Sequence, residues 1–491
     1  MQTEIVNRFN LVDEPWIPVA DKGLVSLRQI FSDSSLKKLH GDPVLKIAIT
    51  KLLLAIVQAS FTPVNNDEWQ VLGPNGFAEK ANNYLENFKN RFWLFGNEPF
   101  LQMPMIEKAV IQNYGVLQFD TATGNTTILQ QSQKERALTD AEKAQLLVLV
   151  MSFALGGKKK DNSVILSSGY TGKGKTSKPG PSLGNYGYLH NFLAGRNLTE
   201  TLWLNIITKE QISEITSFSA GLGIPPWERM PSGENCNIAN QLKNSYIGRL
   251  VPLSRFLLLK VDGLHHSEGI QYPSHKEGGF DLTIAVDHSK EPKVIWANIE
   301  KKPWRQLPSL LSFFNLDNKK NYDCKQLRFG IFRARSSVPK FGIWSGGVSV
   351  DHQTGEQFVK GNKDYIESEF SFSSESCGET WFNLLKEEMN SLDEISKILY
   401  GATSGYFRQL KTDGKKIADL ASNLFWQLCE QVFQDLVDAC ADKTGQKSKT
   451  FRKTFALFID KAYNTYCPKE TARQLDAWAA NRPNLSKYLS V

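Results

Sequence analysis

The residues with the clearest chemical potential lie in a stretch rich in glycine and lysine, from Gly156 to Gly187. Within it, Gly169 to Thr176 matches the pattern G-x-x-x-x-G-K-[ST], which holds nucleotide phosphates in ATPases. That chemistry requires a helix to begin at the lysine, so that its N-terminal amides face the phosphates. Here Pro179 and Pro181 follow at once and prevent a sustained helix. We therefore expect a long, basic, mobile loop, and a phosphate-loop ATPase is the alternative.

Other catalytic or metal-binding constellations are weak. The six cysteines include no Cys-x-x-Cys pair, so the spacing of a zinc ribbon is absent. His265, His266 and His275 lie near Glu268 and Glu277, but their spacing fits no tetrahedral site, and we expect a polar surface loop. No G-x-S-x-G elbow occurs. The sequence thus predicts no catalytic residue, no metal ligand and no cofactor, which indicates a protein that is not an enzyme.

Lysines of the glycine-rich stretch suit a polyanionic partner. Glycine lets a backbone approach the floor of a groove, and lysine neutralises phosphates. The net charge of +7 permits such a partner without requiring one. A solvated loop that binds nothing is the alternative. The lysines expected at a nucleic-acid backbone are Lys158, Lys159, Lys160, Lys173, Lys175 and Lys178.

Two further groups of cations lie later in the chain. Residues 328–332 alternate apolar and polar side chains, a turn follows at Ser336 to Pro339, and the alternation resumes at 341–344. This pattern predicts a hairpin with a basic tip, which could enter a duplex or be an ordinary exposed turn. The C-terminal cations could line a nucleic acid or form a surface of salt bridges. They are Arg408, Lys411, Lys415, Lys416, Lys447, Lys449, Arg452 and Lys453.

The elements that must position these residues can be outlined from the sequence. Asp42 and Pro43 predict a helix start, with the proline at its first position. Thr139 and Glu142 form a capping box that opens a helix over 138–155, which leads directly into the glycines. No regular alternation of strands and helices appears, so antiparallel pairing is expected. Strand-like runs cover 257–261, 282–286, 294–297 and 327–332.

The C-terminal quarter changes to helix from about Gly378. Apolar residues at three-to-four spacing, with breaks at 413–414, 444–445 and 468, predict four antiparallel helices. The fold class is therefore α+β, with a large mixed N-terminal domain over 1–370 and a four-helix bundle over 371–491. The longest apolar runs fall short of the roughly 20 residues that span a bilayer. We expect a cytoplasmic protein without a membrane partner.

Four segments carry a resemblance to a known family. Phe9 to Val19, FNLVDEPWIPV, resembles the opening of the CasA family, and Phe95 to Gln102, FGNEPFLQ, resembles its Pro-Phe-x-Gln segment. Pro225 to Glu228 and Tyr246 to Arg255 resemble two further family segments in the same order. The helical C-terminus has the size expected for the family. The resemblance covers the whole chain.

The resemblance implies the large subunit of a type I-E CRISPR Cascade complex of a prokaryote. Family members recognise a protospacer-adjacent motif on duplex DNA, largely from the minor groove, whose code is degenerate. They promote strand opening and R-loop formation, and then recruit a helicase-nuclease for antiviral defence. The implied partners are the guide crRNA, double-stranded target DNA, the backbone, 5′-handle-binding and small Cascade subunits, and the helicase-nuclease. A scaffold subunit without direct DNA contact is an alternative.

The resemblance also implies roles for individual residues. The family's minor-groove glycine loop and its motif contacts resemble Gly156, Gly157, Lys158, Gln130 and Arg255. The family's strand-separating hairpin, where some members carry a glutamine at the tip, resembles Arg335, Ser336 and Ser337. The loop that anchors the subunit to the complex and guide resembles Asn125, Ile128, Leu129 and Gln130. DNA backbone contacts are expected from Lys159, Lys160, Lys173, Lys175, Lys178, Arg408, Lys411, Lys415, Lys449 and Arg452.

Overall fold

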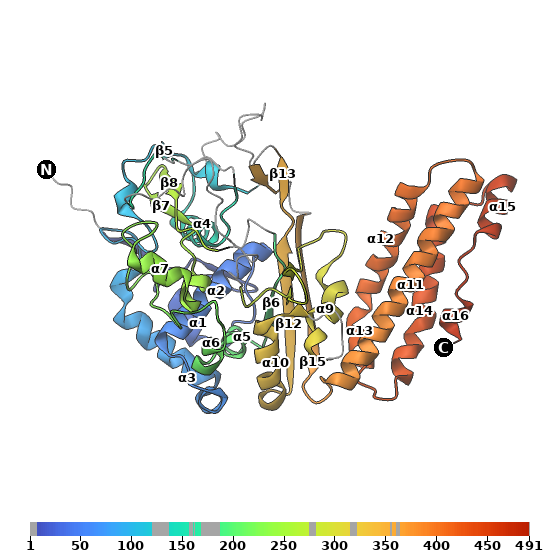
Figure 1. The fold of residues 1–491 in the computed structure, drawn as a ribbon, viewed down its shortest axis with the longest axis horizontal. Coiled ribbons are helices and arrows are strands. Elements are labelled where there is room, and N and C mark those ends of the chain that lie inside the picture. Colours follow the sequence, from blue (N-terminus) through green and yellow to red (C-terminus); the bar gives the residue numbers. More distant parts are fainter. Residues whose placement is uncertain are drawn as a thin grey trace. The chain divides into compact units, whose positions relative to one another are not determined.

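The chain divides into two compact units, drawn as a ribbon in Figure 1. The structure is a computed structural model that describes residues 7–119, 137–156, 161, 163–167, 187–273, 281–314, 322–353, 356–359 and 364–490. Unit 1 comprises 1–303, 322–337 and 341–369, and unit 2 comprises 304–321, 338–340 and 370–491. Segments 304–321 and 338–340, which the sequence analysis assigned to the N-terminal domain, therefore belong to unit 2.

A buried helix, α2 (Pro43–Ser60), lies at the centre of unit 1. It begins as predicted, with Asp42 as N-cap and Pro43 in the first turn. Its length and mean hydropathy of 1.6 would also suit a membrane span, but 78% of it is buried inside the protein, as in a core helix. It contacts α3, α4, α5 and α8. The α-helices of unit 1 are α1 (Leu27–Ser32), α2, α3 (Asn66–Asn87), α4 (Asp140–Ser152), α5 (Leu198–Asn205), α6 (Lys209–Ser213), α7 (Asn237–Lys243), α8 (Tyr246–Leu250) and α10 (Lys325–Ser337).

Small antiparallel sheets surround these helices, which confirms the predicted α+β class. The three-stranded sheets are β5 (Ile111–Gln112), β8 (Leu264–Glu268) and β7 (Arg255–Leu259); β6 (His190–Ala194), β12 (Lys340–Val348) and β15 (Tyr365–Ser373); and β9 (Val286–Asp287), β10 (Lys293–Val294) and β11 (Tyr322–Asp323). The two-stranded pairs are β1 (Arg8–Asn10) with β4 (Trp93–Phe95), β2 (Ile17–Val19) with β3 (Gly23–Val25), and β13 (Asp351–Gln353) with β14 (Glu356–Phe358).

Two local predictions are wrong. Residues 327–332 form part of helix α10 and not a strand, because the buried side chains Leu327, Ile331 and Ala334 recur at helical spacing. The alternation that suggested a strand is too short to separate the two periods. His265 and His266 lie on β8, where both are buried, and not in a surface loop.

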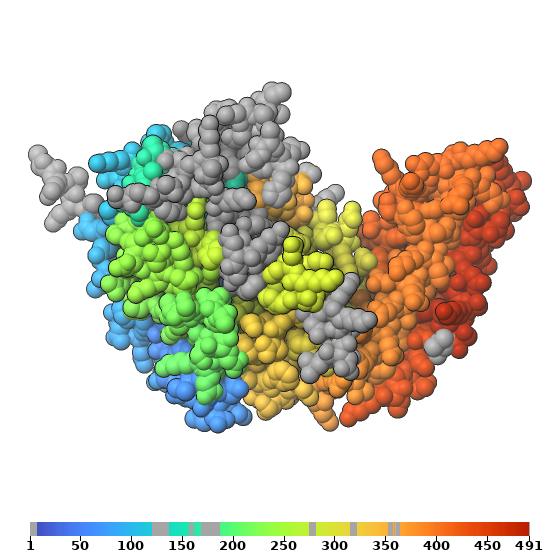
Figure 2. Space-filling view, viewed as in Figure 1, coloured from blue at the N-terminus to red at the C-terminus, as the bar shows by residue number. Residues whose placement is uncertain are grey.

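Unit 2 is a helical bundle that follows the predicted breaks. Its long helices are α11 (Glu379–Gln409), α12 (Lys415–Gln431) and α14 (Gln446–Tyr466), and α15 (Ala472–Ala480) packs on α11. The broad face of unit 2 in Figure 2 is formed mainly by α11 and α12, drawn in orange. The shorter helices are α9 (Leu307–Leu310), α13 (Phe433–Ala439) and α16 (Ser486–Leu489). The four-helix bundle predicted for the C-terminus is therefore present.

Candidate nucleic-acid interface

Three parts of unit 1 meet where α4 ends. Helix α4 opens with the predicted capping box of Thr139 and Glu142, ends at Ser152, and is followed by a short extended segment up to Gly156. The Gly156 amide donates to the Gln357 side-chain oxygen at 2.7 Å, and the Gln357 amide donates to the Gly156 carbonyl at 2.9 Å. Gln357 belongs to β14, so the glycine is held directly against the β13–β14 hairpin. Figure 1 shows α4 and β13 towards the same end of unit 1.

The segment before residue 120 joins the same meeting point. The Val359 amide, just after β14, donates to the Phe119 carbonyl at 3.1 Å. The rings of Phe119 and Phe153 lie 6.2 Å apart, which packs this segment against the end of α4. We call the described residues Phe119, Phe153–Gly156 and Gln357–Val359 the glycine–hairpin platform. It brings together three segments that are distant in the sequence.

Arg255 lies beneath the platform and not on its surface. Its residue is 2% exposed, so the prediction that it contacts DNA is contradicted by its burial. Its Nη2 donates to the carbonyls of Ala154 at 3.3 Å and Leu155 at 3.1 Å, and Glu268 on β8 lies 3.7 Å from its Nη1. Burial lowers the pKa of Arg255, while the Glu268 carboxylate raises it. The guanidinium therefore ties the two residues before Gly156 to the β7–β8 sheet.

The predicted strand-separating hairpin at Arg335, Ser336 and Ser337 is also wrong. These residues form the last turn of α10, where the Ser336 hydroxyl donates to the Arg333 carbonyl at 3.0 Å. A hairpin does occur at β13–β14, with Asp351 opposite Phe358 and Gln353 opposite Glu356. Its sequence signal is Thr354-Gly355, two turn-forming residues between polar strands of three residues each. That signal is weak because the strands lack an apolar face.

Many predicted site residues lie outside the described residues, and no statement is made about their structure. These are the whole anchoring loop, the glycine and lysines after Gly156, and the phosphate-loop pattern with its lysines. They comprise Asn125, Ile128, Leu129, Gln130, Gly157, Lys158, Lys159, Lys160, Lys173, Lys175 and Lys178. The platform nevertheless contains the two residues, Phe119 and Gly156, from which the chain enters residues 120–136 and 157–160.

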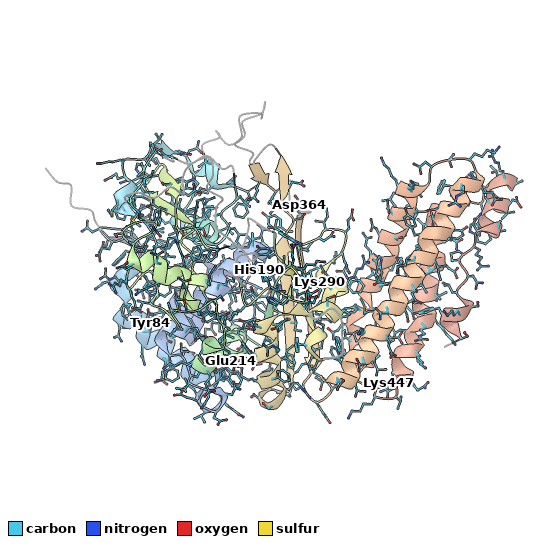
Figure 3. The ribbon with its side chains drawn as sticks, in the orientation of Figure 1. Tyr84, His190, Glu214, Lys290, Asp364 and Lys447 are labelled. Carbon is cyan, nitrogen blue, oxygen red and sulfur yellow. The ribbon has the colours of Figure 1, made fainter. Side chains whose placement is uncertain are left out.

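The predicted cations of unit 2 do not form one edge. Arg408, Lys411 and Lys415 are exposed around the turn from α11 to α12, at the upper end of the bundle in Figure 1. Lys449 lies in the first turn of α14, close to Lys447, which Figure 3 labels at the opposite end. Among the described residues, these four side chains have no ion-pair partner, so the alternative of a salt-bridged surface does not apply to them.

Arg452 differs from these cations. It is 8% exposed, and its Nη2 lies 3.1 Å from Oε1 of Glu388 on α11. The Glu388 carboxylate also accepts from the Ser448 hydroxyl at 3.4 Å, and the Arg452 guanidinium lies over the Tyr488 ring. The prediction that Arg452 contacts a DNA backbone is therefore contradicted by its place in the bundle interior.

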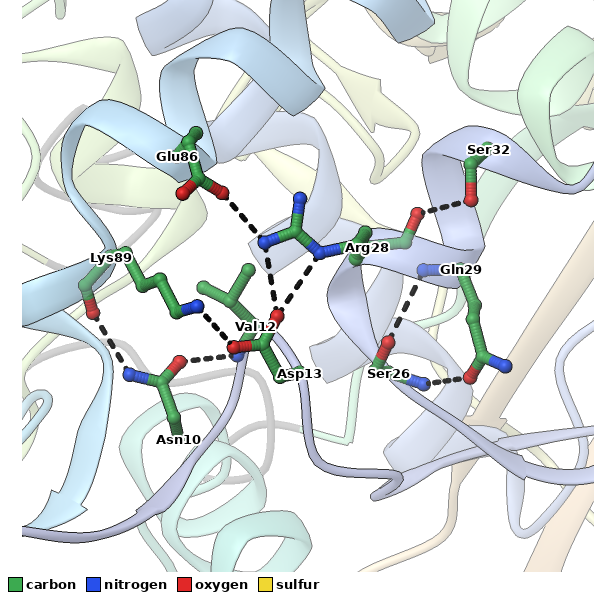
Figure 4. A network of polar contacts seen from close by, with 9 residues as sticks. All are labelled: Asn10, Val12, Asp13, Ser26, Arg28, Gln29, Ser32, Glu86 and Lys89. Atoms are coloured by element: carbon green, nitrogen blue, oxygen red, sulfur yellow. Dashed lines mark hydrogen bonds and ion pairs between the residues drawn. The ribbon is translucent and has the colours of Figure 1, made fainter.

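The segments that carried the family resemblance have structural roles. Figure 4 shows Asp13 paired with Arg28 and Lys89, while Asn10 accepts from the Val12 amide and donates to the Lys89 carbonyl. Burial would raise the pKa of Asp13, but hydrogen bonds from Lys89 and Arg28 lower it. These contacts join the first strand to α1 and to the end of α3.

Two further motifs hold the sheets and helices beneath the platform. The Gln102 side chain donates to the Leu94 carbonyl at 2.6 Å and accepts from the Leu259 amide at 2.7 Å, which joins β4 to β7. In the Pro225–Glu228 motif, Trp227 donates to the Tyr84 hydroxyl at 2.7 Å, and Glu228 accepts from that hydroxyl. These residues support the site without forming it.

The largest described hollow of unit 1 lies apart from the platform. This cavity of about 320 Å³ has a floor of Phe192, Leu193, Leu198 and Trp344. Lysines at its mouth are occupied, because Lys38 pairs with Glu369 at 2.7 Å and Lys46 with Glu367 at 2.8 Å. Those pairs leave these two lysines unsuited to binding phosphates.

Comparisons with known proteins give a consistent answer. The family model described as CRISPR-associated protein Cse1 matches residues 10–483. A curated relative from Thermus thermophilus, CRISPR-associated protein CasA/Cse1, is 29% identical over 218 residues; the alignment spans 41% of this chain and 40% of that relative's length.

Solved structures share the fold over nearly the whole chain. Thermobifida fusca Cse1 matches with a TM-score of 0.76 and 17% identity, covering 98% of this chain and 97% of that one. Thermus thermophilus CasA matches with a TM-score of 0.74 and 17% identity, covering 98% and 99%. A chain of a structure titled CRISPR RNA-guided surveillance complex matches with a TM-score of 0.66 and 17% identity, covering 98% and 99%.

Proposed function

The chain belongs to the CRISPR-associated Cse1 (CasA) family and is a large subunit of Cascade, and from this we propose that it recognises a protospacer-adjacent motif on duplex DNA and opens the adjoining base pairs. Opening allows the guide crRNA to pair with the target strand and form an R-loop. The subunit then recruits the helicase-nuclease for antiviral defence. In this role it positions and separates DNA strands and catalyses no reaction.

The observation that carries the proposal is the direct bonding of Gly156 to the β13–β14 hairpin. A minor groove is about 6 Å wide, so a glycine backbone suits a reader that must enter it. A wedge must lie beside that reader to separate the next base pair. We propose that Gly156 and Gly157, with Lys158, read the groove and that the β13–β14 hairpin is the wedge. Gln353 precedes the hairpin tip in sequence and is our candidate for the glutamine that some family members place there.

The remaining contacts are assigned by the chemistry of their side chains. Lys159, Lys160, Lys173, Lys175 and Lys178 neutralise DNA phosphates, each contact adding about 0.9 to the salt slope. The loop with Asn125, Ile128, Leu129 and Gln130 anchors the subunit to the guide and to the 5′-handle-binding, backbone and small subunits. Its proposed place in the assembly agrees with the position of residues 120–136 directly after Phe119 on the platform.

The proposal is tested with the assembled complex on duplexes with and without the correct motif. We expect replacement of Gly156 and Gly157 by leucine to remove the preference for the motif. Loss of readout at one base pair costs about 1–3 kcal/mol, or roughly 5- to 150-fold in affinity. Gly401→Leu is the matched control, because a Cβ at Gly401 on α11 meets no atom within 4 Å.

Two outcomes would contradict this function. An unchanged preference for the motif in the Gly156/Gly157 variant would exclude the glycines as the reader. A second measurement uses crosslinking from residues 156–178 to DNA in the wild-type complex. The absence of motif-dependent crosslinks would favour a scaffold that binds protein and RNA without touching DNA.

A further inference from the structure

The β13–β14 hairpin has few described attachments that fix its direction. It forms a two-stranded sheet of its own and is joined to no larger sheet among the described strands. A lone two-stranded ribbon is marginally stable in water, so its orientation depends on what holds it. The described backbone attachments are the pair between Gly156 and Gln357, the bond from Val359 to Phe119, and the bond from the Ser349 amide to the Asp364 carbonyl at 2.9 Å. Gly156 is therefore a principal support of the hairpin.

Gly156 is itself held from below by buried groups. The Arg255 guanidinium donates to the carbonyls of Ala154 and Leu155, and Glu268 compensates its charge within the β7–β8 sheet. Removing one partner of such a buried pair leaves the other charge uncompensated, so the pair is expected to stay together. A continuous chain of bonds thus runs from the sheet through Arg255 to Gly156 and through Gln357 to the hairpin.

The contact at Gly156 leaves little room for another residue. A Cβ added there would lie 3.2 Å from Oε1 of Gln357, which is closer than most real Cβ contacts. The Gln357 side chain occupies the space that a side chain at residue 156 would need. Any displacement of Gly156 by a bound ligand would therefore be transmitted to Gln357.

We propose that Gln357 is a positioning residue that couples motif reading at Gly156 to strand opening by the β13–β14 hairpin, a role that rests on the proposed function. When the minor groove presses on the glycine segment, the two hydrogen bonds carry that displacement into β14. The hairpin then advances towards the base pair beside the motif. Arg255 and Glu268 provide the fixed end against which the movement occurs.

The test separates opening from binding in the assembled complex. Gln357→Leu keeps the side-chain size but removes the oxygen that accepts from Gly156, whereas Gln357→Glu retains an acceptor oxygen. Opening is measured as permanganate reactivity of thymines beside the motif, at concentrations where each variant is fully bound. A hydrogen bond contributes about 1 kcal/mol, so we expect Gln357→Leu to reduce opening roughly fivefold and Gln357→Glu to restore most of it.

A duplex already mismatched beside the motif provides the control for structural damage. With this probe, Gln357→Leu should form the R-loop as the wild type does, because no wedge is needed. Equal opening of the paired duplex by wild type and Gln357→Leu would overturn the coupling. A defect that persists on the mismatched duplex, or that Gln357→Glu does not relieve, would assign Gln357 to folding or assembly and also overturn it.

These outcomes differ from failure of the proposed function itself. If the Gly156/Gly157 variant keeps its preference for the motif, the glycines do not read DNA, whatever Gln357 does. If that variant loses its preference while Gln357→Leu opens DNA normally, the reading role stands and only the coupling fails.

Discussion

Burial divides the cations of this chain into those that can meet a nucleic acid and those that hold the fold. Arg255 and Arg452 lie inside their units with Glu268 and Glu388 as partners, so each stabilises neighbouring segments. Sequence patterns place lysines and arginines near one another but do not reveal which of them turn inward. The charge of a residue alone therefore overstates the number of phosphates that the chain can neutralise.

The most enclosed cation of unit 1 is Lys51 on α2, whose ammonium contacts the Asp281 carboxylate. The side chain of Lys51 is 1% exposed, and burial lowers its pKa while Asp281 raises it. Burial also acts to raise the pKa of Asp281, but the charges of Lys51 and His190 lower it below its usual value. The pair is a buried ionic contact that depends on both members.

We predict that the Lys51–Asp281 pair makes folding sensitive to acid. Because the folded-state pKa of Asp281 is depressed, its stabilisation is complete above the unfolded value of about 3.9 and is lost as pH falls below it. Asp281→Asn should lower the free energy of unfolding by about 3–5 kcal/mol at neutral pH, because Lys51 loses its partner. Urea unfolding over a pH series measures both effects.

The control for this prediction is Asp21→Asn, in the exposed turn between β2 and β3. Its backbone is left-handed, with a φ of 65°, which asparagine also tolerates. We expect a change within about 0.5 kcal/mol. An equal loss of stability in both variants, or an Asp281→Asn protein as stable as wild type, would show that the buried pair contributes little.

Among the elements, Gly330 explains how α10 packs against β6. A Cβ at Gly330 would lie 2.1 Å from Leu193 Cδ1 and 3.2 Å from the Leu204 carbonyl oxygen. Leu193 is fully buried, so it has little space into which to move. The glycine therefore permits a close approach of helix and strand, and that approach is invisible in the local sequence pattern.

We predict opposite effects for alanine at two helical glycines. Gly330→Ala should destabilise unit 1 by about 1–3 kcal/mol through overpacking. Gly401→Ala on α11 should be neutral or stabilise by up to about 1 kcal/mol, because its Cβ has open space and glycine is a poor helix former. Chemical denaturation of each variant gives the values, and a harmless Gly330→Ala would refute the close packing.

The contrast between elements shows what the sequence could predict. The start of α2, the capping box of α4 and the breaks of the bundle depend on neighbouring residues, and all were predicted correctly. Helix α10 was missed because a short alternation fits both periods, and the β13–β14 hairpin because its strands are short and polar. At the candidate site, Gly156 could be singled out, but its partner Gln357 is 201 residues away. No local pattern encodes such a contact.

At the scale of the molecule, unit 2 carries exposed cations at both ends of its bundle. Arg408, Lys411 and Lys415 surround the α11–α12 turn, and Lys447 and Lys449 begin α14. Helix α12 has 17 residues and so separates these ends by about 25 Å. That distance exceeds a Debye length of roughly 8–10 Å, so the two groups act independently towards a polyanion.

We predict that the cations at the α11–α12 turn contact DNA phosphates in the assembled complex. The Arg473 Nη2 donates to the Leu410 carbonyl at 3.0 Å, which adds another cation at this end. Replacing Arg408, Lys411 and Lys415 by alanine should reduce the slope of log affinity against log salt by about 0.9 for each phosphate that is no longer neutralised. Binding of a motif-bearing duplex over a salt series measures this slope.

The opposite end of the bundle supplies a matched control with the same change of charge. Lys447, Lys449 and Lys453 are exposed on the first turns of α14, and alanine at all three removes three positive charges as well. A general effect of net charge would lower both slopes alike, whereas a local DNA contact lowers only that of the α11–α12 turn variant. Equal slopes for both variants and wild type would remove the bundle cations from the DNA path. A change confined to the α14 variant would place the DNA at the other end, because screening prevents either group from acting over the length of α12.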